Sequence, residues 1–75
     1  MEAKIKEIVS NIAEVEITEV GSDTDLIEEL DVDSMMALEI LTDVERSFQI
    51  RVPDEELPNF TSVRSISNIV KKIMG

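Results

Sequence analysis

The sequence predicts an all-α fold: a small four-helix bundle with three main helices, one short helix and a long loop between the first two main helices. Three observations support it. Apolar residues recur at spacings of three and four in three separate segments. Aromatic residues are 3% of a chain that is 43% apolar, so aliphatic side chains must build the core. Seventy-five residues suffice for one domain, which we place at residues 1–75.

The first helix is expected over about residues 2–15, where one apolar stripe runs between charged residues. This stripe consists of Ile5, Ile8, Val9, Ile12 and Ala13. Residues 16–33 show no sustained helical period and contain a run of turn-forming residues, so a long loop is predicted there. Leu26, Ile27 and Leu30 are expected to pin this loop against the core.

The second main helix is predicted from Ser34 to Gln49, because its apolar residues fall on one face at about 100° per residue. The face predicted to meet the core consists of Ala37, Ile40, Leu41, Val44 and Phe48. The opposite side carries Met35, Glu39, Thr42 and Arg46, with Met36 and Leu38 on its flanks. The exposed side of this helix is therefore partly apolar near its start.

The remaining chain predicts one short and one long helix. Residues 52–57 are typical of a short helical turn, opened by Pro53 and closed by Pro58. The last helix follows a cap supplied by Thr61 or Ser62. Its apolar stripe consists of Val63, Ile66, Ile69, Val70 and Ile73.

Composition restricts the function. Seventeen acidic residues against seven basic ones give a net charge of −10, which repels nucleic acid and anionic membranes and attracts basic proteins. The absence of Cys and His removes thiol chemistry, the usual zinc ligands and the usual general base, so an enzyme acting alone is not expected. No uncharged run approaches the length of a membrane span. A cytoplasmic monomer is predicted.

The most informative stretch runs from Asp25 to Val52 and reads DLIEELDVDSMMALEILTDVERSFQIRV. In it Ser34 lies between Asp33 and Met35, at the predicted start of the second main helix. Here the chain resembles the acyl carrier protein family, whose hallmark is an Asp-Ser-Leu triplet at the start of the second helix. The wider match consists of Asp25, Leu26, Glu28, Leu30, Glu39, Val44, Glu45, Phe48, Val52, Pro53 and Asp54. The Asp-Ser pair alone is a weak signal, but together with length, acidity and helix spacing it is a strong one.

Physical chemistry independently makes Ser34 suitable as an attachment point. A hydroxyl between an exposed loop and a helix start is accessible to another enzyme, and the unpaired amides and helix dipole there favour a phosphodiester anion. The alternative is that Ser34 is only a helix N-cap, the commoner role of serine at such a position. Asp33 either orients the modifying enzyme or serves as an acid at a helix terminus.

The resemblance implies that a phosphopantetheinyl transferase moves 4′-phosphopantetheine from coenzyme A onto Ser34, and that the terminal thiol then carries acyl groups as thioesters. It also implies docking of acyl-processing enzymes with basic patches on the second helix. The docking candidates are Met35, Met36, Glu39, Glu45 and Arg46. The residues aligned with the family's acyl-chain cavity are Leu26, Val44, Val52, Leu57, Phe60 and Ile66, which plain core packing would also explain.

Four positions depart from the family pattern. Met35 replaces the usual leucine, Met36 replaces a commonly acidic or polar residue, and both make the docking surface more apolar. Arg46 stands where carriers of general fatty acid synthesis commonly have an acid. Asp31 replaces a common glycine and can still adopt a left-handed conformation at some cost. These departures favour a specialised carrier for a polyketide, lipopolysaccharide or other lipid pathway over a general fatty acid carrier.

Two other classes compete with the acyl carrier. A peptidyl or aminoacyl carrier uses the same serine chemistry but typically has Gly-Gly before its motif, where this chain has Asp31 and Val32. A small acidic interaction or calcium-binding module is the other class. Asp31 and Asp33 fit the first two ligand positions of an EF-hand loop, but Met35 stands where the third oxygen ligand belongs. Diffuse binding of divalent cations to the acidic surface remains compatible with the sequence.

Overall fold

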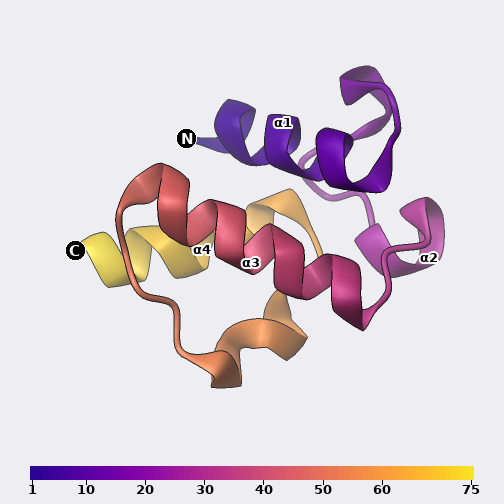
Figure 1. The fold of residues 1–75 in the computed structure, drawn as a ribbon. Coiled ribbons are helices and arrows are strands. Elements are labelled where there is room, and N and C mark those ends of the chain that lie inside the picture. The colour runs from indigo at the N-terminus through magenta and orange to yellow at the C-terminus, as the bar shows by residue number, and fades with distance from the viewer.

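The computed structural model describes residues 1–75 and contains helices but no strands. The elements are α1 (Glu2–Ala13), the 3₁₀ helix η1 (Ile17–Glu19), α2 (Leu26–Leu30), α3 (Ser34–Phe48), the 3₁₀ helix η2 (Asp54–Asn59) and α4 (Val63–Met74). The predicted all-α class with three main helices is confirmed. In Figure 1, α3 crosses the front of the molecule below α1, α4 lies behind it, and η2 lies beneath it. None of the helices combines the length and apolar character that a membrane crossing requires.

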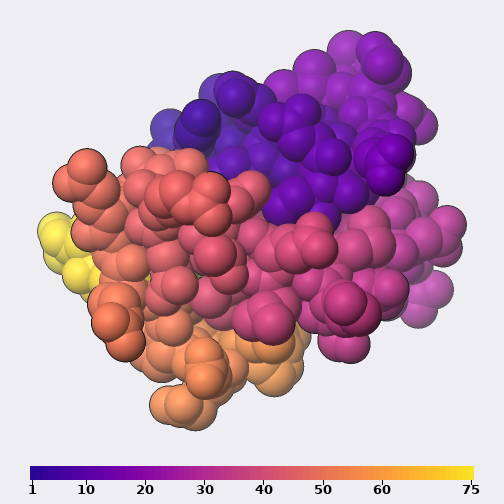
Figure 2. Space-filling model, viewed as in Figure 1, coloured from indigo at the N-terminus to yellow at the C-terminus, as the bar shows by residue number.

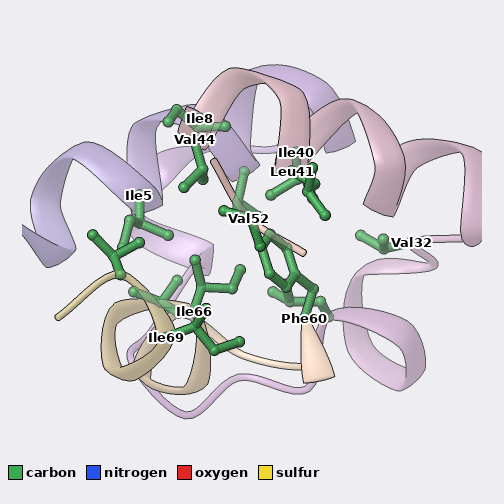
Figure 3. Close-up of a cluster of buried hydrophobic side chains, with 14 of the residues drawn as sticks. Ile5, Ile8, Val32, Ile40, Leu41, Val44, Val52, Phe60, Ile66 and Ile69 are labelled. Atoms are coloured by element: carbon green, nitrogen blue, oxygen red, sulfur yellow. The ribbon is translucent and has the colours of Figure 1, made fainter. Parts of the chain in front are cut away.

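One hydrophobic cluster of 15 buried residues joins α1, α3 and α4 to the connecting segments. Phe60 is the one aromatic side chain in it, as expected for a chain so poor in aromatics. Figure 3 labels Ile5, Ile8, Val32, Ile40, Leu41, Val44, Val52, Phe60, Ile66 and Ile69. Val32, Val52 and Phe60 come from outside the long helices, so the connecting segments are part of the core.

The ends of the long helices are set by local backbone geometry. Glu14 adopts a left-handed conformation (φ 57°), so α1 ends at Ala13, two residues before the predicted end. Gln49 does the same (φ 55°) after α3. At the start of α4, the Ser62 hydroxyl accepts a hydrogen bond from the Ser65 amide at 3.1 Å, so Ser62 is the cap, one of the two predicted candidates.

The prediction of a loop without helix over residues 16–33 was wrong in detail, because this stretch holds η1 and α2. The Asp25 carboxylate caps α2 by accepting from two of its first amides, each at 3.0 Å. Of the three predicted pins, Leu26 is fully buried and Leu30 is half-buried. Ile27 was predicted wrongly, since its side chain is 52% exposed. One turn of helix buries a single side, and Ile27 lies on the other.

The short helix after α3 also differs from the prediction. It spans Asp54–Asn59 and contains Pro58, which was expected to end it. A 3₁₀ turn tolerates this proline because only one amide is lost, while the Glu56 and Phe60 amides still donate to the carbonyls of Pro53 and Leu57. The turn thus continues until it places Phe60 in the core.

Arg64 at the start of α4 holds the long first connection in place. Its Nε and Nη2 donate to the two carboxylate oxygens of Asp23 at 2.6 Å and 3.0 Å. Its backbone amide donates to the Ser22 carbonyl at 2.8 Å, and the Leu26 amide donates to the Thr61 carbonyl at 2.9 Å. The hydrogen bond from Arg64 is the main reason that the pKa of the Asp23 carboxyl is lowered; desolvation opposes it, and the positive charge of Arg64 adds a smaller lowering effect.

This pair predicts a pH-dependent contribution to stability. Because the Asp23 pKa is lower in the folded protein, the stabilisation is complete above about pH 4, the ordinary pKa range of aspartate, and disappears as the pH falls through the lowered value. Asp23→Asn should therefore reduce the melting temperature at pH 7 and match the wild type in strong acid. Thermal unfolding followed by circular dichroism from pH 2 to pH 7 measures this. The control Asp54→Asn removes an exposed carboxylate; an equal effect of both variants would contradict the prediction.

Candidate functional site

Ser34 is the first residue of α3, and its side chain is exposed. The capping role belongs to Asp33, whose Oδ1 accepts a hydrogen bond from the Met36 amide at 2.9 Å. The Ser34 hydroxyl forms no hydrogen bond within the chain. Of the two interpretations of Ser34, the helix N-cap is therefore wrong, and the hydroxyl remains free for chemistry at a helix N-terminus.

The preceding backbone explains why Ser34 points outward. Asp31 adopts the left-handed conformation (φ 56°) that the sequence allowed for it, and it ends α2. Val32 is buried at 3% exposure, and its amide donates to the Leu26 carbonyl at 3.0 Å. With Val32 anchored in the core, the next two residues lie exposed at the surface. A short segment anchored at Val32 thus presents the serine.

The cap itself can be tested. Asp33→Ala removes the acceptor for the Met36 amide and should cost about 0.5–2 kcal/mol of unfolding free energy. Asp33→Asn keeps a side-chain oxygen at this position, so it should cost only a few tenths of a kcal/mol of unfolding free energy. Urea denaturation measures both, with Glu55→Ala as an exposed acidic control that forms no hydrogen bond. Equal losses for the alanine and asparagine variants would contradict the capping role.

An apolar hollow of about 360 Å³ opens beside Ser34, between the start of α3 and η2. Its lining consists of Ile27, Val32, Asp33, Ser34, Ala37, Leu57, Pro58 and Phe60. Of the six residues predicted for an acyl-chain cavity, only Leu57 and Phe60 line it. The remaining predicted residues, Leu26, Val44, Val52 and Ile66, are buried in the core. The Ser34 hydroxyl and an apolar recess therefore share one site.

The sequence contained a partial signal for the missed lining residues. Ala37 follows Ser34 by three positions, so the two lie on neighbouring parts of the same helix surface. The small side chain of Ala37 leaves room that a larger residue would fill. Ile27 and Pro58 gave no such signal, because their positions depend on how α2 and η2 pack beside α3.

The predicted docking residues divide into two groups. Met35 is 73% exposed, and Glu39 and Arg46 are also exposed. Part of α3 lies uncovered at the front of the molecule in Figure 2. Met36 is half-buried and packs against the core. Glu45 is half-buried, and its Oε2 accepts from the amide of Val52, seven residues along the chain, at 2.7 Å. One carboxylate oxygen of Glu45 is therefore engaged by the backbone of the segment that follows α3.

Known proteins that are similar in sequence point to the same site. Residues 3–70 match the family model described as the phosphopantetheine attachment site. A polyketide-8 synthase acyl carrier protein 2 from Streptomyces avermitilis is 33% identical over 72 residues, covering 96% of this chain and 83% of that protein. Acyl carrier proteins from Buchnera aphidicola (36% identity, 96% and 92% coverage) and Akkermansia muciniphila (33%, 100% and 94%) are similar over nearly their whole length. The chain therefore belongs to the phosphopantetheine attachment-site family, the family of the acyl carrier proteins.

Proposed function

We propose that this chain, as one domain over residues 1–75, is an acyl carrier protein whose Ser34 holds 4′-phosphopantetheine through a phosphodiester to its hydroxyl oxygen. The observation that carries the proposal is the exposed Ser34 hydroxyl, left free because Asp33 caps the helix. When bound, the arm supplies a thiol that carries an acyl group as a thioester. The chain presents and protects this cargo and performs no catalysis of its own.

The residues around Ser34 fit such an arm. A phosphodiester on the hydroxyl would lie at the positive end of α3, near the first helical amides, which have no acceptor within the helix. The apolar hollow beside it suits the organic part of the arm or the first carbons of a cargo. Asp33 adds a nearby negative charge, and its carboxylate is engaged by the Met36 amide. The anion therefore meets hydrogen-bond donors as well as one acid.

Partner enzymes would approach along the outer face of α3. Met35 and Glu39 follow Ser34 on the exposed side of the helix and offer an apolar contact and a negative charge. A net charge of −10 would increase the rate of encounter with basic enzymes, chiefly at low salt. Met36 and Glu45 contribute less to this proposal, because both are partly buried. A monomer in the cytoplasm stays a prediction from composition.

The biosynthetic pathway that this carrier serves can be assigned only to a broad class. Relatives named for polyketide synthesis and relatives named only as acyl carrier proteins match this chain at similar identity. We infer a carrier for fatty acid, polyketide, lipopolysaccharide or other lipid synthesis and favour a specialised pathway because of Arg46. Elongation at the rate of the native carrier by a reconstituted general fatty acid synthase would contradict that specialisation.

The attachment is tested by incubating the protein with coenzyme A and a promiscuous phosphopantetheinyl transferase, followed by mass spectrometry of the intact protein. One added arm per chain is expected, and the new thiol should react with a thiol reagent, since the unmodified chain has no Cys. A peptidyl or aminoacyl carrier would also gain an arm but would be charged by an amino-acid-activating domain. An acidic interaction module would gain no mass.

A further inference from the structure

A second hollow, of about 380 Å³, lies on the outer face of α3, beside the end of α1. Its lining consists of Ile12, Leu38, Glu39, Thr42, Asp43 and Arg46. Ile12 and Leu38 supply its apolar surface, and Leu38 is 51% exposed. The other four residues surround this apolar part with polar and charged groups. Met35 precedes it on the same exposed side, so the hollow continues the surface next to Ser34.

Arg46 in this hollow has unused binding capacity. Its one ionic contact is Asp43, three residues earlier, at 3.4 Å, and its side chain is 75% exposed. The guanidinium forms no hydrogen bond within the chain. Arg64 differs, because its Nε and Nη2 both donate to the Asp23 carboxylate, at 2.6 Å and 3.0 Å. An exposed pair such as Arg46 and Asp43 contributes little to stability, so the planar fork of Arg46 remains open to an external carboxylate.

The charges on this face are ordered along the helix. Arg46 is the sole cation of α3, and its acidic residues are Glu39, Asp43 and Glu45. Seven residues separate Glu39 from Arg46, which is two turns or about 10 Å along the axis. The exposed face therefore carries only an acid, Glu39, on the side nearer Ser34, and its one cation, Arg46, beside Asp43 farther away. A uniformly basic partner would meet a like charge at Arg46.

We propose, resting on the function proposed above, that the outer face of α3 docks acyl-processing enzymes with a two-sign patch. A basic residue of the enzyme pairs with Glu39, a carboxylate about 10 Å away pairs with the Arg46 fork, and an apolar side chain enters the hollow against Leu38. Arg46 is the specificity-determining residue: it favours partners with an acid at this point and disfavours those with a base.

The test uses one condensing enzyme of general fatty acid synthesis, of known structure and with a uniformly basic docking patch, as probe. A second probe is the same enzyme with the basic residue that faces position 46 changed to glutamate. Binding of the arm-loaded carrier to both is measured by fluorescence anisotropy at low salt. The wild type should bind the glutamate probe about fivefold more tightly than its parent, and Arg46→Glu should reverse this preference.

Lys71→Glu is the matched control, since Lys71 is an exposed cation in the last turn of α4, as Arg46 is in the last turn of α3. It changes the net charge equally and should keep the wild-type preference. Identical effects of the two variants, or no measurable binding to either probe, would overturn the docking proposal. Failure of a transferase to load Ser34 would instead overturn the proposed function. Loading is measured separately, by mass with excess transferase, so the two failures are distinguishable.

Discussion

Replacement of Ser34 with alanine is expected to abolish attachment of the phosphopantetheine arm completely. The hydroxyl oxygen is the atom that would form the phosphodiester, and alanine has no substitute for it. The variant should remain folded, because Ser34 is the first helical residue, the cap is Asp33, and alanine is the best helix former. Its unfolding free energy should lie within about 0.5 kcal/mol of the wild type. Mass spectrometry after treatment with coenzyme A and a transferase measures the attachment.

Ser47→Ala provides the matched control, because Ser47 is an exposed serine on the same helix. This variant should gain one arm at the wild-type rate. If Ser34→Ala still gained an arm, the attachment point would have to be another residue. No arm on the wild type, with a transferase active on another carrier, would remove the carrier function and leave a small acidic helical protein. A circular dichroism spectrum of Ser34→Ala confirms that any loss is chemical rather than structural.

Phe60→Ala is expected to produce the largest loss of stability in the chain. Phe60 is 2% exposed, is the one aromatic in the core, and belongs to the buried cluster drawn in Figure 3. Removing such a ring typically costs about 3–5 kcal/mol, because lost burial and a residual cavity add together. A domain of this size has a total stability of only about 5 kcal/mol or somewhat more, so a large fraction of the variant should be unfolded. Urea denaturation measures the loss.

Phe48→Ala is the natural comparison, since Phe48 is the chain's other phenylalanine and only half-buried at the end of α3. Its loss should be clearly smaller. Phe60→Leu keeps most of the apolar volume, so the protein should stay folded with a wider hollow beside Ser34. This variant should still accept the arm. Equal destabilisation by the two alanine variants would show that Phe60 is not the central core residue that its burial indicates.

The long helices could be predicted from the sequence because each repeats its apolar pattern over at least three turns. In α3, the buried Ile40, Leu41 and Val44 belong to the predicted stripe. The short elements could not be predicted in the same way. With five residues, α2 completes less than two turns, so no period develops and its existence depends on the Asp25 cap. η2 likewise continues through Pro58 up to Phe60, whose burial depends on contacts with distant segments.

The candidate site was predictable in part. The motif identified Ser34, but the choice between a cap and a free hydroxyl required the backbone, which assigns the cap to Asp33. The predicted cavity was the weaker inference, because it rested on aligned apolar residues. An apolar side chain gives the same sequence signal in a sealed core as on the wall of a hollow. Only packing placed Leu57 beside the hollow and Ile66 out of solvent.

The sequence by itself determined the all-α class, the long helices, the acidic character and the serine at the start of the second main helix. These properties depend on composition, on local apolar periodicity and on a short motif, and each of these can be recognised without knowing which distant segments are in contact. The tertiary structure decided how distant segments come together: Asp23 pairs with Arg64, and Ile27 and Pro58 line the same hollow. Such contacts depend on the relative positions of helices, which result from the packing of all side chains together.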